Sequence, residues 1–137
     1  NFGQTWQIFD TPIIQGNGPQ GIYSMDFADK KNGIIIGGDY SKPLENKANK
    51  AITKDGGKTW TLVADGQNPN YKSCVQYVPN TNGQEVFAVG KTGISFSNDA
   101  GTTWKEVSNE SYYTIQFVDK NTAWLSGNEK IGKLVLK

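Results

Sequence analysis

Three observations predict an all-β fold. A turn motif occurs as TKDGGKTWTLV at 53–63 and SNDAGTTWKEV at 97–107, and a shorter copy, NFGQTWQIF, opens the chain. Short segments alternate apolar and polar residues between Gly, Asn, Asp and Pro, which is typical of half-buried antiparallel strands. Trp6, Trp60 and Trp104 are 54 and 44 residues apart, a period found in propeller blades. Together these features predict a β-propeller of four-stranded antiparallel blades, about three of them in this chain.

When the repeats are aligned on their Trp residues, strands are expected at four equivalent positions, which we call columns. The expected strands are 23–29, 73–79 and 113–119 in the first column; 34–38, 86–90 and 123–127 in the second; 51–55, 95–99 and 134–137 in the third; and 7–10, 61–65 and 105–109 in the fourth. The expected organisation is the end of one blade at 1–10, blades at 22–64 and 73–108, and three strands of a closing blade at 112–137.

The repeated turn has a structural explanation. Its Asp can accept hydrogen bonds from nearby backbone N–H groups, its Gly can adopt a positive φ, and its Trp can lie across the blade. We therefore expect a fastening rather than a catalytic or ligand-binding role. The residues concerned are Asp55, Gly57, Thr59 and Trp60 in one copy, and Ser97, Asp99, Gly101, Thr103 and Trp104 in the other.

The turn pattern S-x-D-x-G-x-T-W resembles the Asp-box, or BNR, repeat of sialidases and many other propellers. The copy at 97–104 matches throughout, and the copy at 53–60 has Thr53 in place of Ser. This resemblance implies a fold and leaves the function open.

A wider resemblance covers nearly the whole chain. The stretches FGQTWQIFDTPIIQGNGPQGIYSMDF, IIIGGDY, YKSCVQYVP and GISFSNDAGTTW look like the C-terminal part of a bacterial family, often from Bacteroidetes, labelled "oxidoreductase" or photosystem II assembly factor-like. The resemblance implies a several-bladed, exported protein, whether periplasmic, on the outer surface or secreted. No GxGxxG after a strand, no CxxC and no haem or flavin signature supports the oxidoreductase label, so no cofactor is expected.

The two ends of the chain complement each other. Reading Lys137 on to Asn1 restores the repeat, because KLVLK followed by NFGQTW overlays KAITKDGGKTW. One expectation is the C-terminal part of a six- to eight-bladed chain, which the absence of an initiator Met favours. The alternative is two copies assembled head to tail into a six-bladed ring. The expected partners are therefore the remaining blades or a second copy.

Composition excludes several kinds of chemistry. All 14 basic residues are Lys, with no Arg and no His, and the net charge is +1. Without His, triad hydrolysis and His-based metal sites are excluded within these residues, and Cys74 lacks a base to activate it, so a packing role is expected there. A sialidase would need an Arg triad. The even charge predicts no nucleic-acid partner, and the short apolar runs predict no membrane insertion.

Three loops break the repeat on the face opposite the turns, where propellers usually bind partners. They span 11–21, 39–50 and 65–72, and ordinary polar loops are the alternative interpretation. The candidate surface residues are Gln20, Asp39, Tyr40, Tyr71 and Lys72. The sequence thus favours a non-catalytic binding or assembly scaffold for a protein or glycan. The alternative is a glycoside hydrolase-like enzyme with two carboxylates about 5 to 10 Å apart, supplied partly by missing blades.

Overall fold

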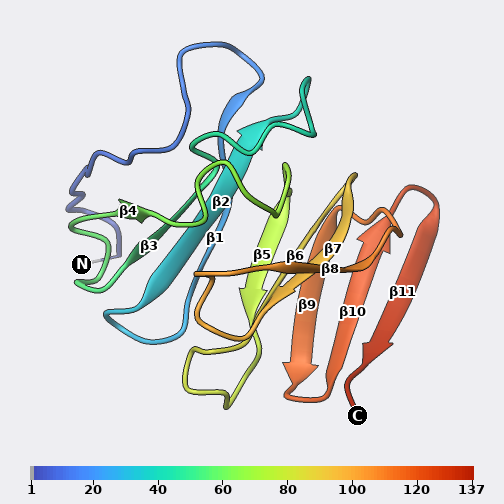
Figure 1. The fold of residues 1–137 in the computed structure, drawn as a ribbon. Coiled ribbons are helices and arrows are strands. Elements are labelled where there is room, and N and C mark those ends of the chain that lie inside the picture. The colour runs from blue at the N-terminus through green and yellow to red at the C-terminus, as the bar shows by residue number, and fades with distance from the viewer. Residues whose placement is uncertain (1) are drawn as a thin grey trace.

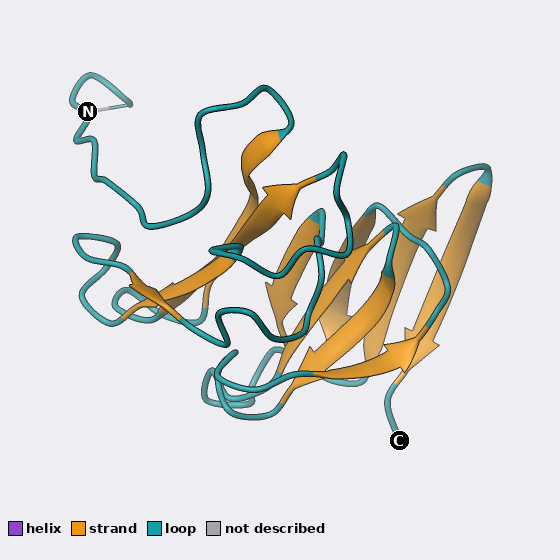
Figure 2. Cartoon of the chain, turned by 45° about the horizontal axis from the view of Figure 1, so that its top comes forward, coloured by secondary structure: helices purple, strands orange, loops and turns teal. Residues whose placement is uncertain are grey.

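The computed structural model describes residues 2–137, which form three antiparallel sheets and, within that range, no helix (Figure 1). The sheets follow one another in chain order and pack face to face, joined by the loops at 63–73 and 109–113 (Figure 2). Because there is no helix among these residues, none is long and apolar enough to cross a membrane.

Two sheets have four strands and the third has three. The first contains β1 (Gln20–Phe27), β2 (Gly33–Asp39), β3 (Lys50–Thr53) and β4 (Thr61–Leu62). The second contains β5 (Cys74–Tyr77), β6 (Val86–Gly90), β7 (Gly93–Ser97) and β8 (Lys105–Ser108). The third contains β9 (Thr114–Asp119), β10 (Thr122–Gly127) and β11 (Lys130–Val135). In each sheet the spatial order follows the chain order, as a meander requires.

The second strand of each four-stranded sheet is buried along its whole length. β2 and β6 contain no exposed residue, because each has packing partners on both faces of its sheet. Ile34 and Ile36 of β2 face the second sheet, whereas Ile35 packs with Ile13 and Ala51 on the other face. This explains why IIIGG and VFAVG read as continuous apolar runs rather than as alternating strands.

The first strands of neighbouring sheets are joined by hydrogen bonds that backbone N–H groups donate to side-chain oxygens. The Asp26 carboxylate accepts from Tyr77 N at 2.8 Å, and the Gln76 amide oxygen accepts from Phe117 N at 2.6 Å. Asp26 and Gln76 occupy the same place in successive repeats. A polar residue at this place therefore joins each sheet to the next.

The structure corrects two of the expected strands. The third strand of the last repeat is β11, Lys130–Val135, and not 134–137, because β10 and β11 form a tight hairpin in which Gly127 pairs with Lys130. Residues 7–10 form no strand. The N-terminal segment instead runs beside the first sheet, where Ile13 is 3% exposed.

Candidate binding surface

The sheets have two chemically different ends. At one end, β1, β5 and β9 begin, and the loops at 39–50 and 63–73 lie there; we call it the loop end. The turns at 54–60 and 98–104 connect strands at the opposite end, the turn end. The antiparallel order of each sheet produces this separation, since alternate connections fall on opposite sides.

Each repeated turn is held by its own side chains. The Asp99 carboxylate accepts from Thr103 N at 2.8 Å, from the Thr103 hydroxyl at 2.6 Å and from the Ser97 hydroxyl at 2.8 Å. The Ser97 hydroxyl in turn accepts from Gly101 N at 2.9 Å, and the Trp104 indole N–H donates to Gly101 O at 2.8 Å. The Asp99 carboxylate thus holds the turn together through three hydrogen bonds.

The other turn repeats the same contacts at 2.6 to 3.0 Å. Its residues are Thr53, Asp55, Gly57, Thr59 and Trp60. The hydroxyl of Thr59, together with its backbone N–H, lowers the pKa of Asp55 to about 2. Hydrogen bonds that stabilise the charged form have this effect, so the carboxylate stays ionised at neutral pH.

Three tyrosines and a lysine gather at the loop end. The ring of Tyr23 meets that of Tyr40 edge-on at 6.3 Å between centroids, and that of Tyr71 edge-on at 5.2 Å. The Lys91 ammonium lies 5.8 Å from the ring centroids of both Tyr40 and Tyr71, and it donates to Tyr40 O. These four residues, the tyrosine cluster, come from both the first and the second sheet. Tyr23 and Tyr40 are 38% and 48% exposed, whereas Tyr71, at 7%, forms the floor.

Gln20 and Asp39 lie beside the cluster as partners across β1 and β2. The Gln20 amide donates to the Asp39 carboxylate at 3.2 Å, and Ser41 donates to it from its hydroxyl at 2.5 Å and its N–H at 2.9 Å. The Ser41 hydroxyl is the main cause that lowers the pKa of Asp39. Asp39 is therefore a buried anion that holds the start of the 39–50 loop, and it is unsuited to act as a general acid at neutral pH.

Lys72 does not belong to this surface, so that expectation is wrong. Its side chain is fully buried and donates to the Thr92 hydroxyl at 3.0 Å and to Gly93 O at 3.1 Å, with a Glu106 carboxylate oxygen at 3.5 Å. Successive side chains of an extended segment point in opposite directions. Since Tyr71 faces the loop end, Lys72 points into the second sheet, where burial lowers its pKa.

Sequence reasoning missed Tyr23 and Lys91. The sequence offered a signal for Tyr23, because Tyr23 is the first residue of an expected first strand. Ser73 and Tyr113 occupy the same position in the other repeats. Lys91 had none, since it lies in the short connection between β6 and β7 like any solvated turn lysine. Only the packing of the second sheet on the first brings it to the tyrosines.

The tyrosine cluster offers groups that can contact a ligand. Burial raises the pKa of Tyr23 and of Tyr71, so both phenols stay protonated at neutral pH. The Tyr23 hydroxyl donates to Pro19 O at 2.7 Å. Exposed aromatic rings beside a cation offer stacking, edge contacts and a hydrogen-bond donor. Within residues 2–137 no group of three or more Cys, Asp and Glu is placed to hold a metal ion.

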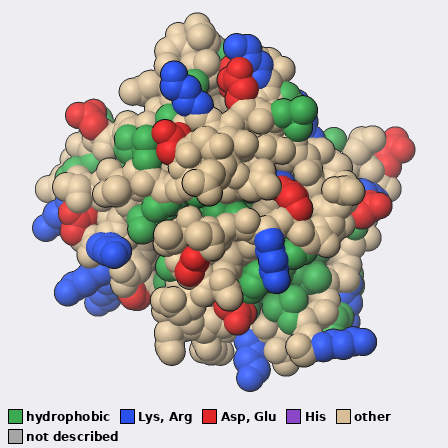
Figure 3. Space-filling model, in the orientation of Figure 1, with side chains coloured by type: hydrophobic (Ala, Val, Ile, Leu, Met, Phe, Trp, Pro, Cys, Tyr) green, Lys and Arg blue, Asp and Glu red, His purple; other side chains and the backbone are tan. Residues whose placement is uncertain are grey.

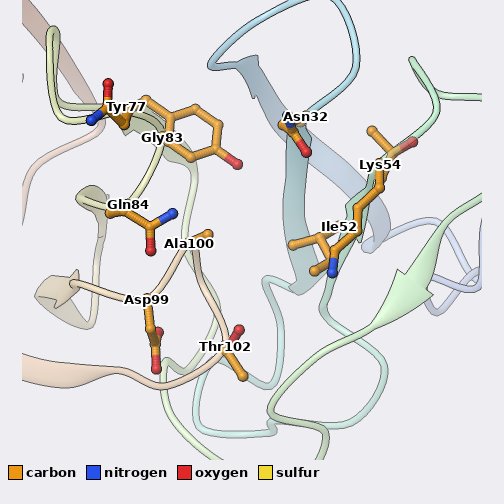
Figure 4. A pocket seen from close by; sticks show the side chains of 12 residues that line it. Asn32, Ile52, Lys54, Tyr77, Gly83, Gln84, Asp99, Ala100 and Thr102 are labelled. Atoms are coloured by element: carbon orange, nitrogen blue, oxygen red, sulfur yellow. The ribbon is translucent and has the colours of Figure 1, made fainter.

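A separate cavity lies at the turn end, between the first and second sheets (Figure 4). It has a volume of about 320 Å³ and a mostly polar lining that includes Asn32, Lys54, Tyr77, Gln84 and Asp99. Burial, followed by the charges of Asp26 and Asp29, raises the pKa of Tyr77 to about 12. Asp99 contributes a carboxylate to this lining, and that carboxylate accepts hydrogen bonds from Thr103 N and the Thr103 hydroxyl.

Charges of both signs occur on the face of the molecule that Figure 3 shows. In Figure 3, Lys and acidic side chains alternate across the visible face, with apolar side chains between them. The mixture agrees with a net charge of +1.

Comparison with known proteins identifies similarity in fold. No family model and no curated protein matches the chain. Among solved structures, one described as YCF48 bound to D1 peptide has 22% identity and a TM-score of 0.62, and the match covers 93% of this chain and 44% of that one. An ancestral GH74 enzyme has 16% identity and a TM-score of 0.61, covering 89% and 18%. The chain thus spans less than half the length of either structure, and the similarity confirms the all-β, propeller-type fold predicted from the sequence.

Proposed function

We propose that this chain is a non-catalytic binding scaffold that holds a peptide segment of another protein against the tyrosine cluster. The observation that carries the proposal is the exposure of Tyr23 and Tyr40 beside Lys91, on a floor made by Tyr71. Tyrosine supplies large contact area at little cost in conformational entropy, which is why it is enriched at the centres of protein interfaces.

The surroundings of the cluster favour a preformed site. Tyr71 is packed beneath the exposed rings, Asp39 holds the adjoining loop, and Lys91 ties the second sheet to Tyr40 of the first. A surface that is already ordered loses less entropy on binding. One similar structure contains YCF48 with a bound peptide, and we assign the same class of partner to this chain. From sequence resemblance we also assign the repeated turns to the Asp-box class. On the same ground we assign the chain to an exported protein.

The alternative is a carbohydrate-active enzyme, a class to which the GH74 structure belongs. Aromatic rings could stack on sugars, but glycoside hydrolysis needs two carboxylates about 5 to 10 Å apart. Asp39 is the one carboxylate beside the described tyrosine cluster, and its oxygens are held by Gln20 and Ser41. This arrangement favours the scaffold over the enzyme.

The test is selection of binders from a displayed library of random 12-residue peptides, followed by affinity measurement with fluorescein-labelled peptides. We expect Tyr40→Ala to weaken binding of the selected peptides at least about tenfold, a loss typical of a central interface tyrosine. Tyr113→Ala is the matched control, since Tyr113 is 50% exposed immediately before β9 and lies outside the cluster; we expect it to change affinity less than about twofold. Peptides that bind wild type and Tyr40→Ala equally would overturn the proposal, as would release of reducing sugar from a polysaccharide panel.

A further inference from the structure

Within residues 2–137 the third sheet has three strands, whereas the first and second sheets each have a fourth, outer strand. β4 and β8 cover the outer edges of β3 and β7, whereas no strand of the described chain pairs with the outer edge of β11. Beside this edge runs a groove of about 420 Å³ that opens between the second and third sheets. Its lining is mainly apolar and includes Phe87, Ile94, Phe96, Val107, Leu134 and Leu136.

The first and second sheets show what fills the equivalent position. There Trp104, immediately before β8, packs against the core that contains Ile34, with Ile52 beside it. Ile34 and Ile52 are paired residues of β2 and β3, and the corresponding pair of β6 and β7 is Phe87 and Phe96. The groove therefore presents the pair of side chains on which the Trp of a following turn would rest.

The N-terminal segment has the shape and sequence to supply that Trp. Its Gly3 and Trp6 have the spacing of Gly101 and Trp104. Phe2 and Gly3 have φ values of 50° and 81°, close to the 59° and 87° of Ala100 and Gly101. A Cβ added to Gly3 would lie 3.4 Å from the Trp6 ring, the same separation as between Gly101 and the Trp104 ring. The segment is thus already folded as the repeated turn.

This preformed turn has no core to pack on. Phe2, Trp6 and Ile8 are 109%, 84% and 94% exposed, and the segment forms no strand. The N-terminal segment lies at the first sheet, with the second sheet between it and β11, as Figures 1 and 2 both show. A chain cannot reach its own groove with this segment, but a second copy can.

We propose that the groove beside β11 binds residues 2–9 of a second copy of this chain, with Trp6 resting on Phe87 and Phe96 and residues 7–9 adding a fourth strand to β11. A free strand edge provides backbone hydrogen bonds for the added strand, and the groove provides the pocket for its side chain. The exchange is reciprocal, so two copies share two identical interfaces and bury both sets of exposed apolar residues. The interface is separate from the tyrosine cluster.

Native mass and sedimentation of the 137-residue protein test this proposal. We expect a species of twice 15.0 kDa, and we expect Trp6→Ala and Val107→Glu each to convert it to the monomer. Trp6 is exposed in the single chain, so its substitution leaves the fold of that chain intact even if Val107→Glu does not. Leu44→Glu is the matched control, because Leu44 is 74% exposed on the 39–50 loop, away from both surfaces; it should remain a dimer.

Mixing the two monomeric variants gives the sharpest readout. Trp6→Ala retains an intact groove and Val107→Glu retains an intact segment, so an equal mixture can form one of the two interfaces. We expect a mixed two-chain species that neither variant forms alone. A wild-type protein that stays at 15.0 kDa at concentrations on the order of 100 µM would overturn the proposal, as would a dimer that survives both substitutions or a mixture that stays monomeric.

Discussion

Substitution of Gly101 by Ala measures how closely a repeated turn is packed against the preceding sheet. Gly101 has a φ of 87°, and a Cβ there would lie 2.5 Å from Ile34 Cδ1, whose residue is fully buried. Gly57 is the matched position in the other turn. It has a φ of 86°, but its Cβ would meet nothing closer than 3.6 Å. Both substitutions carry the same backbone strain, and only Gly101→Ala adds a steric overlap.

The two costs differ enough to be separated. An L-residue in the left-handed region costs about 1–2 kcal/mol, which is the loss of unfolding free energy expected for Gly57→Ala. Overpacking a core typically costs about 1–3 kcal/mol more. The overlapping atom is a terminal methyl but has to move within a packed core, so the added cost should fall near the low end. We expect Gly101→Ala to lose about 2–4 kcal/mol in all.

Urea unfolding followed by tryptophan fluorescence, at one fixed protein concentration, gives both values. The further substitution Ile34→Val removes the Cδ1 methyl. In that background Gly101→Ala should cost no more than Gly57→Ala, so the excess appears as a coupling energy between the two sites. Equal losses for the two single variants would refute the reasoning, as would an excess that persists in the Ile34→Val background.

Two further predictions concern the pH dependence of stability. Burial lowers the pKa of Lys50 to about 8, so the unfolded chain binds the extra proton and stability should rise as pH increases from about 8 towards the ordinary lysine value. We expect Lys50→Met to flatten this rise in the free energy of unfolding, measured with urea at pH values below those at which tyrosine titrates. An unchanged slope of unfolding free energy against pH would show that Lys50 does not cause the rise. The hydrogen bonds from Thr59 lower the pKa of Asp55 to about 2. The ionised Asp55 carboxylate therefore stabilises the folded state above the ordinary Asp pKa, and this stabilisation is lost as pH falls from about 4 to about 2. Asp55→Asn should remove that part of the acid sensitivity measured by fluorescence, and an acid-unfolding curve of unchanged shape would argue against it.

Local pattern was sufficient for most strands and insufficient for β11. β6 has the bounds expected from VFAVG, because a strand between two sheets is apolar throughout. β11 begins at Lys130 instead of 134, and the Gly at 132 is what weakened its strand pattern. A Cβ at Gly132 would lie 2.5 Å from the Tyr112 hydroxyl oxygen. The glycine makes room for this ring, a requirement that only the packed structure reveals.

The residues of the candidate surface were also only partly predictable from the sequence. Gln20 and Asp39 are brought together by strand pairing alone, since β1 begins at Gln20 and its antiparallel partner β2 ends at Asp39. The prediction for Lys72 was wrong because adjacent side chains of an extended segment point in opposite directions. Only one of Tyr71 and Lys72 can face the loop end, and it is Tyr71. The loop carries no alternating pattern that would decide this.

By itself, the sequence determined the all-β class, the propeller repeat and the design of the turns, because each of these depends on contacts within a few residues. The hydroxyl, carboxylate and glycine that hold a turn all lie within five positions, from Ser97 to Gly101. Only the tertiary structure decided that Tyr23, Tyr40, Tyr71 and Lys91 form one surface, and that Phe87 and Phe96 line an open groove. Those neighbours lie on different strands and loops, and their contact depends on how one sheet stacks on the next.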